Sequence, residues 1–276
     1  MPRRTFKMLN RLTVLCLAAF LGASMPALAI DCTKANDHVD KAICGNAGLK
    51  AADATMGSAY TALLKTAPDA EIRAMLVSSQ RRWVAARNEW LSSDGSNGNS
   101  FPIAHLRKAM VDRTALLTDR SDKGFVAHAE AQRRFLAKFT GGAFSGFDTS
   151  CEFIPNDSGQ TSFSYQCNGA IHVQNKERLC SLSTEFASWS LYMYHAVSTV
   201  AADQAKPVAF CGDQSGDICG ESKEGEWESA PKPDQHFPVL KTGFPKLDAE
   251  ANWPLDEADE TWFGQCLTSP TYPTVH

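Results

Sequence analysis

The segment IDCTKANDHVDKAICGNAGLKAAD, residues 30–53, decides how the first half of the chain folds. In it, Cys32 and Cys44 bracket a short charged stretch of eleven residues. Metal sites built from cysteine usually contain a close C-x-x-C pair, and the sequence has none. We therefore expect a disulfide between Cys32 and Cys44, which would stabilise the fold by about 2–3 kcal/mol through loop closure.

The residues before this segment predict export. Residues 1–29 join a basic start to an apolar run that has signal-peptide length and is too short to span a bilayer comfortably. The tripeptide ALA at 27–29 has the small-x-small pattern of a signal-peptidase site. We predict cleavage after Ala29, a periplasmic or secreted protein, and no stable membrane insertion of the mature chain. The alternatives are an uncleaved anchor helix and a lipid anchor at Cys16.

The charge of the mature chain limits the class of partner. The whole sequence has a formal charge of −4, which becomes −8 when the four basic residues of the leader are removed. A negative protein favours a cationic partner or none, and we expect no nucleic-acid ligand. Solubility alone is an equally good explanation of this charge.

Eight cysteines remain after the leader is removed, and an even number in an exported chain predicts four disulfides. Besides the first pair we expect Cys151–Cys167, Cys211–Cys219 and Cys180–Cys266, although six cysteines allow fifteen pairings. A thiol nucleophile is disfavoured because an oxidising compartment would consume it.

One glycine-rich loop, residues 210–222, offers a weak calcium site. Its candidate ligands are Asp213, Asp217 and Glu221. Carboxylate oxygens are the ligands that calcium prefers, but the spacing is not that of an EF-hand. A solvated loop closed by a disulfide is the alternative.

Apolar residues recur at helical spacing up to about residue 140. The pattern predicts helices at residues 33–44, 47–66, 69–92, 102–119 and 123–139. Neighbouring helices joined by short loops indicate a small helical bundle.

Three charged residues interrupt the apolar stripes of these helices: Asp53, Arg87 and Arg113. A charge facing a core is costly unless it is paired. We therefore predict a structural ion pair between Asp53 and the arginines. The alternative is a ligand-binding carboxylate or an arginine clamp.

Several of these residues form a wider pattern over residues 31–117. The shared positions are Asp31-Cys32, Asp40, Ile43-Cys44, Leu49, Asp53, Tyr60, Leu63-Leu64, Gln80, Trp83, Arg87, Arg113 and Leu117. In this pattern the segment resembles the N-terminal domain of the LprI-like lysozyme inhibitor family. The resemblance implies an exported inhibitor that binds lysozyme, a cationic protein. The family usually has a second cysteine pair, where this sequence has Trp90 and, at about the other position, His105.

The second half has a different composition, with aromatic residues, glycines, prolines and six cysteines. It predicts strands on either side of a turn at NDSG, residues 156–159, whereas residues 179–197 fit either a strand or a buried helix. We expect an α+β protein: a signal peptide (1–29), a disulfide-stapled helical domain (30–120), a helical connector (121–140) and a cysteine-rich, mainly β domain (141–276). We expect its proline-rich tail to be extended along the surface.

Catalytic motifs are missing from the sequence. It contains no H-E-x-x-H, no G-x-S-x-G and no phosphate-binding glycine loop. We therefore predict a non-enzymatic binding protein without a cofactor, with a cationic lysozyme as the candidate protein partner. The alternatives are an envelope interaction module of other specificity and an unrecognised hydrolase in the C-terminal half.

Overall fold

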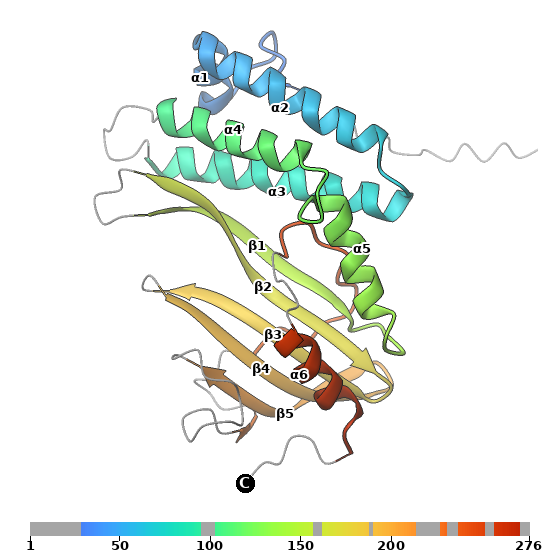
Figure 1. Cartoon of the computed structure of the whole chain (residues 1–276). Helices are drawn as coiled ribbons and strands as arrows, with labels where there is room; N and C mark the ends of the chain where they lie inside the picture. The colour runs from blue at the N-terminus through green and yellow to red at the C-terminus, as the bar shows by residue number, and fades with distance from the viewer. Residues whose placement is uncertain are drawn as a thin grey trace, which may run out of the picture.

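The computed structural model describes residues 29–94, 103–156, 162–187, 190–213, 227–230, 237–251 and 257–270. Four helices gather at one end of the molecule, an antiparallel sheet forms the other end, and a fifth helix runs from one to the other (Figure 1). The predicted α+β class is therefore confirmed. Among the described residues, no helix is both long and apolar enough to cross a membrane.

The helices follow the predicted pattern. They are α1 (His38–Gly45), α2 (Ala47–Lys65), α3 (Ala70–Asp94), α4 (Ile103–Thr118) and α5 (Phe125–Leu136). The first begins five residues later than predicted, because Asp37 is its N-cap and accepts a hydrogen bond from the Asp40 N–H at 2.7 Å. Asn46 caps α2 in the same way, accepting from the Leu49 N–H at 3.0 Å. We call α1–α4 the helical region.

Consecutive strands pair in a six-stranded antiparallel sheet. They are β1 (Gly146–Pro155), β2 (Phe163–Asn175), β3 (Arg178–Ala187), β4 (Ser190–Ala201), β5 (Gln204–Asp213) and β6 (Glu228–Ser229). The sequence left strand or helix open for residues 179–197; of these, 179–187 belong to β3 and 190–197 to β4. One further helix, α6 (Glu257–Thr268), was not predicted. We call the strands together with α6 the sheet region.

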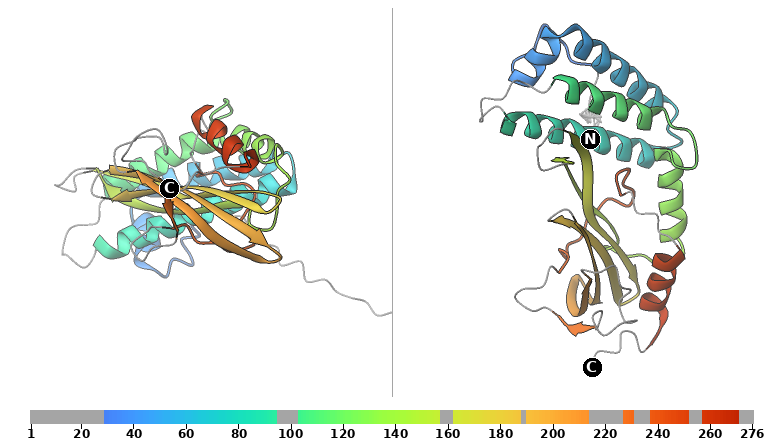
Figure 2. Two further views of the ribbon diagram at one scale, coloured as in Figure 1. Left: turned by 90° about the horizontal axis from the view of Figure 1, so that it is seen from below. Right: turned by 60° about the vertical axis from the view of Figure 1, so that its left-hand side comes forward.

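One face of the sheet is apolar, and α5 and α6 lie on the same side of it (Figure 2). Its core residues are Phe147, Ile171, Val173, Cys180, Leu182, Val197 and Ala209, packed against Phe135 of α5 and Trp262, Phe263, Cys266 and Leu267 of α6. Side chains alternate between the faces of a strand, so the same residues leave polar neighbours on the opposite face. The disulfide Cys180–Cys266 joins β3 to α6.

Aromatic rings hold the β1–β2 hairpin against the helical region. The indole of Trp90 stacks on Phe153 with 4.8 Å between centroids and lies 5.0 Å from the ring of Phe163. His105 lies 5.8 Å from the same Phe163 ring. Trp90 and His105 stand where the resembling family usually has its second cysteine pair. Here the hairpin supplies aromatic contacts at those positions in place of a covalent bond.

The chain between the sheet and α6 differs from the predicted surface tail. Residues 237–251 form no regular element, as expected. However, Leu247 and Ala249 belong to the hydrophobic core of the helical region, and Asp248 and Glu250 are buried as well. This part of the tail is therefore interior. The sequence did not predict this burial, because a stretch of only four residues is too short to show a periodic pattern of apolar side chains.

Candidate binding surface

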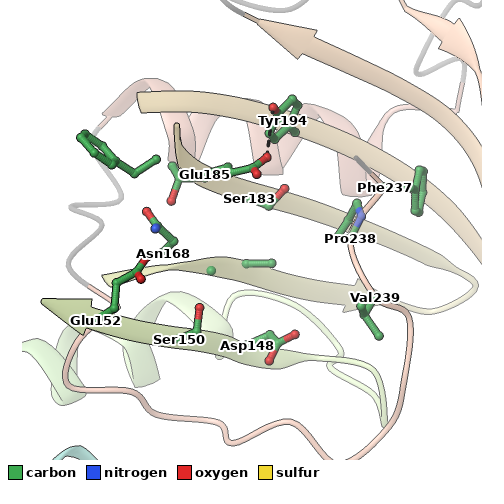
Figure 3. Close-up of a pocket in the computed structure, with 14 residues that line it drawn as sticks. Asp148, Ser150, Glu152, Asn168, Ser183, Glu185, Tyr194, Phe237, Pro238 and Val239 are labelled. Atoms are coloured by element: carbon green, nitrogen blue, oxygen red, sulfur yellow. Dashed lines mark hydrogen bonds between the residues drawn. The ribbon is translucent and has the colours of Figure 1, made fainter. Parts of the chain in front are cut away.

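The polar face of the sheet carries a groove lined by acidic side chains (Figure 3). Asp148, Ser150 and Glu152 are alternate residues of β1 and therefore point to one face. The strand register sets Ser150 beside Asn168 of β2. The other face of β1 is taken up by Phe147 and Phe153, which are buried, so this polar row stays open.

Further strands complete the groove, which has a volume of about 500 Å³. Ser183, Glu185 and Tyr194 come from β3 and β4, and residues 237–239 lie along one end (Figure 3). The Tyr194 hydroxyl donates a hydrogen bond to Glu185 Oε2 at 3.4 Å. Burial, followed by the charge of Glu185, raises the pKa of this hydroxyl above its ordinary value.

The groove is chemically suited to binding cations. Its described lining includes three carboxylates, Asp148, Glu152 and Glu185, and no lysine, arginine, histidine or cysteine. Carboxylates that share a concave surface concentrate the field and attract positive charge. Serine, asparagine and tyrosine groups between them offer hydrogen bonds to a lysine or arginine head group. The arrangement therefore fits a basic surface of a partner.

Negative charge is unevenly divided along the chain. Residues 32–120 have 12 basic and 9 acidic side chains, a formal charge of +3. Residues 121–276 have 11 basic and 21 acidic side chains, a formal charge of −10. Any long-range attraction for a cationic partner therefore arises in the second half of the chain.

The predicted ion pair between Asp53, Arg87 and Arg113 has different partners in the structure. All three residues are buried, as the stripes predicted. Arg113 Nη1 bonds Glu250 Oε1 at 2.9 Å, and Asp53 Oδ2 accepts from the Ile30 N–H at 2.7 Å. Among the described residues, no ion pair joins Asp53 to either arginine.

Arg87 interacts electrostatically with Asp53, although the two residues form no ion pair. Its Nη2 lies 4.0 Å from Asp40 Oδ1, and its guanidinium donates two hydrogen bonds to Asn88 Oδ1. Burial lowers the pKa of Arg87, and the nearby charge of Asp53 opposes this shift. Helical spacing identified the buried faces correctly, but it did not show which charges meet across them.

The cysteines pair largely as expected. Disulfides join Cys32 to Cys44, Cys151 to Cys167 and Cys180 to Cys266. Cys151 and Cys167 lie directly opposite each other on β1 and β2. Cys211 is disulfide-bonded. Its expected partner, Cys219, lies outside the described residues.

The candidate calcium ligands Asp217 and Glu221 also lie outside the described residues, and Asp213 is the last residue of β5. In the described part of the chain, no three histidine, cysteine or carboxylate side chains are close enough to hold a metal ion. The calcium site therefore stays a prediction. The groove carboxylates were not among the residues predicted from the sequence, although polar residues alternate at positions 148, 150 and 152.

Comparison with known proteins finds a match for the helical region but none for the sheet region. Neither a search of curated proteins nor a search of solved structures gave a match. One family model does match, and it covers residues 32–120, which contain α1–α4 and end before α5 and the sheet. The family is described as "Lysozyme inhibitor LprI", so the helical region has the sequence signature of that family, as its cysteines and its W-x-x-x-R motif predicted.

Proposed function

We propose that the protein is an exported, non-enzymatic binding protein that holds a basic surface of a protein partner in the acidic groove of its sheet. A cationic lysozyme is the candidate partner, because residues 32–120 match a lysozyme inhibitor family. The observation that carries the proposal is the groove itself, with three carboxylates and no basic residue in its described lining.

The charge and the structure of the two regions indicate that the sheet region, rather than the helical region, attracts the cationic partner. The helical region, with its +3 charge, is not suited to attract a cationic protein over distance. Residues 121–276, which include the sheet region, have the negative charge, and the sheet has the concave surface and keeps its carboxylates in place. Electrostatic complementarity of this kind speeds association and selects partners more than it adds affinity.

Export is part of the same proposal. Three described disulfides suit an oxidising compartment. We propose cleavage after Ala29, which would leave Ile30 as the first residue. Its nitrogen already lies 2.7 Å from Asp53 Oδ2, so the new ammonium group would meet a buried carboxylate. Amino-terminal sequencing of the protein recovered outside the cytoplasm tests the position of the cut.

The binding proposal is tested by protection of bacterial cell walls from lysozyme. Purified protein with intact disulfides is added in excess, and the loss of turbidity of a cell suspension is followed. The proposal expects that lysis slows with the wild type and that D148N/E152Q/E185Q restores most of the lysis rate. A matched control, D122N/E177Q/D203N, neutralises three exposed carboxylates outside the groove and should inhibit like the wild type.

Two outcomes would count against the proposal. If the folded wild type in excess gives no protection, lysozyme is not the target, and a panel of other cationic proteins then tests the groove alone. If the groove variant and the control inhibit equally, the groove is not the binding surface.

A further inference from the structure

A short acidic segment from the far end of the chain is bound by arginines of the helical region. The guanidinium of Arg82 pairs with both oxygens of Asp248, at 2.9 and 2.7 Å, and its Nη1 also bonds Glu250 Oε2 at 2.8 Å. Arg113 Nη1 takes the other oxygen of Glu250 at 2.9 Å. Bidentate hydrogen bonds between an arginine and a carboxylate are among the strongest and most directional side-chain interactions in proteins.

Polar groups around the arginines complete the recognition. Ser79 Oγ donates to Glu250 Oε1 and accepts from Arg113 Nη2 at 2.6 Å. Gln132 of α5 contacts the backbone, because its Nε2 donates to the Asp248 carbonyl at 2.7 Å and its Oε1 accepts from the Asp248 N–H at 2.9 Å. The side chains of Asp248 and Glu250 are 3% and 4% exposed, so water competes little for these bonds.

The neighbouring side chains of the same segment pack in the hydrophobic core. Leu247 and Ala249 alternate with the two acids and lie in the core formed by the helices. Recognition of an acidic motif by a cluster of arginines is one of the recurring ways in which proteins bind short peptides, and here apolar contacts and main-chain hydrogen bonds accompany it.

The receptor and the bound segment belong to different parts of the sequence. Ser79, Arg82 and Arg113 fall within residues 32–120, the part that matches the inhibitor family, whereas the segment begins more than 120 residues later. We propose that the helical region carries an acceptor site for an extended acidic peptide of pattern apolar-Asp-small-Glu, filled in this chain by its own residues 247–250. This inference concerns the helices and does not depend on the groove.

A tethered ligand hides such a site from free peptides. A segment joined to its receptor acts at an effective concentration of about millimolar, so a free peptide competes poorly until the tethered copy is weakened. The test therefore uses the full chain with D248N/E250Q, which removes both charges and keeps the shapes. The probe is the fluorescein-labelled peptide FPKLDAEA, residues 244–251, followed by fluorescence anisotropy.

We expect D248N/E250Q to bind this peptide at least about tenfold more tightly than the wild type, since the half-buried Arg82 and the buried Arg113 then lack their charged partners. The peptide should also raise the melting temperature of the variant. The same peptide with asparagine and glutamine at the two acidic positions should not bind, and adding R82Q should abolish binding. The matched control D69N/E71Q neutralises two exposed carboxylates that pair with Arg133 and should behave like the wild type.

A milder variant keeps the test decisive if the double substitution prevents folding. E250Q leaves Asp248 to pair with Arg82 and is examined with the same peptide. The proposal is overturned if neither variant binds the peptide more tightly than D69N/E71Q does, or if binding ignores the peptide's carboxylates. It is equally overturned if neither variant folds and the peptide does not restore folding.

Discussion

The helical region and the sheet region use acidic side chains in opposite ways. Against the helical region, Asp248 and Glu250 of the segment before α6 are buried partners of its arginines and join distant parts of the chain. In the sheet region, Asp148 and Glu152 line an open groove that has no basic side chain in its described lining. The same chemical group therefore stabilises one region and leaves the other with a net attraction for cations.

The part of the chain that matches the inhibitor family is not the part that has the negative charge. The region that matches the inhibitor family has a formal charge of +3, and the region without a match has −10. A total charge of −8 for the mature chain suggests a uniformly acidic binder, which this division contradicts. Mutations of these acidic side chains should consequently differ in kind, affecting stability where the acids are buried against the helices and association where they line the groove.

The largest effect on stability is expected for Arg113→Ala. The variant leaves Glu250 buried with one fewer cation, and loss of one partner of a buried ion pair costs about 3–5 kcal/mol of unfolding free energy. Urea denaturation monitored by tryptophan fluorescence measures it. Arg133→Ala is the control, because its ion pairs are exposed on the surface, where solvent screening leaves them little effect on stability. Equal losses in the two variants would contradict the contrast between buried and exposed acids.

In the sheet region, the largest stability effect should depend on pH. His172 is buried, bonds Ser181 Oγ through Nδ1 and stacks on Phe244, and burial lowers its pKa to about 4. The unfolded value is about 6.5, so the unfolded chain binds more protons between these two pH values. Stability should therefore fall as pH drops from about 6.5 to 4, by about 3 kcal/mol from this group.

His172→Gln should remove that part of the pH dependence, because glutamine does not titrate. The measurement is the unfolding free energy of both proteins between pH 7.5 and pH 4, and the relevant quantity is the difference between their slopes. Other groups that titrate in this range contribute to both proteins and cancel. Parallel curves would mean that the histidine is not kept neutral by the fold.

Sequence periodicity predicted the helices well because each buries one face. Leu106, Met110 and Leu117 are buried on one face of α4, and Ile103 is 43% exposed because it begins the helix. Disulfide pairs were predictable from the predicted hairpin and from export. What periodicity did not supply was the partner of each buried charge, since Glu250 lies 137 residues from Arg113.

The groove was harder to predict for a different reason. The alternation of Asp148, Ser150 and Glu152 identifies a polar face, but it does not show that the face is concave. Its concavity depends on residues 237–239, which lie along its end (Figure 3), and its openness depends on α6 covering the opposite face. Both are long-range arrangements of irregular or unpredicted segments.

A smaller loss is expected for Asp53→Asn, and it tests export together with the fold. If cleavage leaves Ile30 as the first residue, its ammonium group bonds a carboxylate that is 5% exposed. Hydrogen bonds to charged groups contribute about 1.5–3 kcal/mol, so the exported variant should lose about 2 kcal/mol. In a version that keeps the residues before Ile30, the donor is an uncharged amide and the loss should be smaller. Equal losses in the two forms would show that no ammonium group meets Asp53.

The smallest effect on stability is expected in the groove, where the change should appear in kinetics. D148N/E152Q/E185Q changes one exposed and two half-buried side chains of an open groove and should alter the unfolding free energy by only about 1 kcal/mol. Its association rate with lysozyme at low salt should fall about three- to tenfold, because steering charges act on the rate of encounter. Raising the salt from about 50 to 300 mM shortens the screening length and should bring the wild-type rate close to that of the variant. Surface plasmon resonance measures both rates, with D122N/E177Q/D203N as the control of equal charge. If the control slows as much as the groove variant, total charge governs association, and the concave arrangement of the carboxylates contributes nothing of its own.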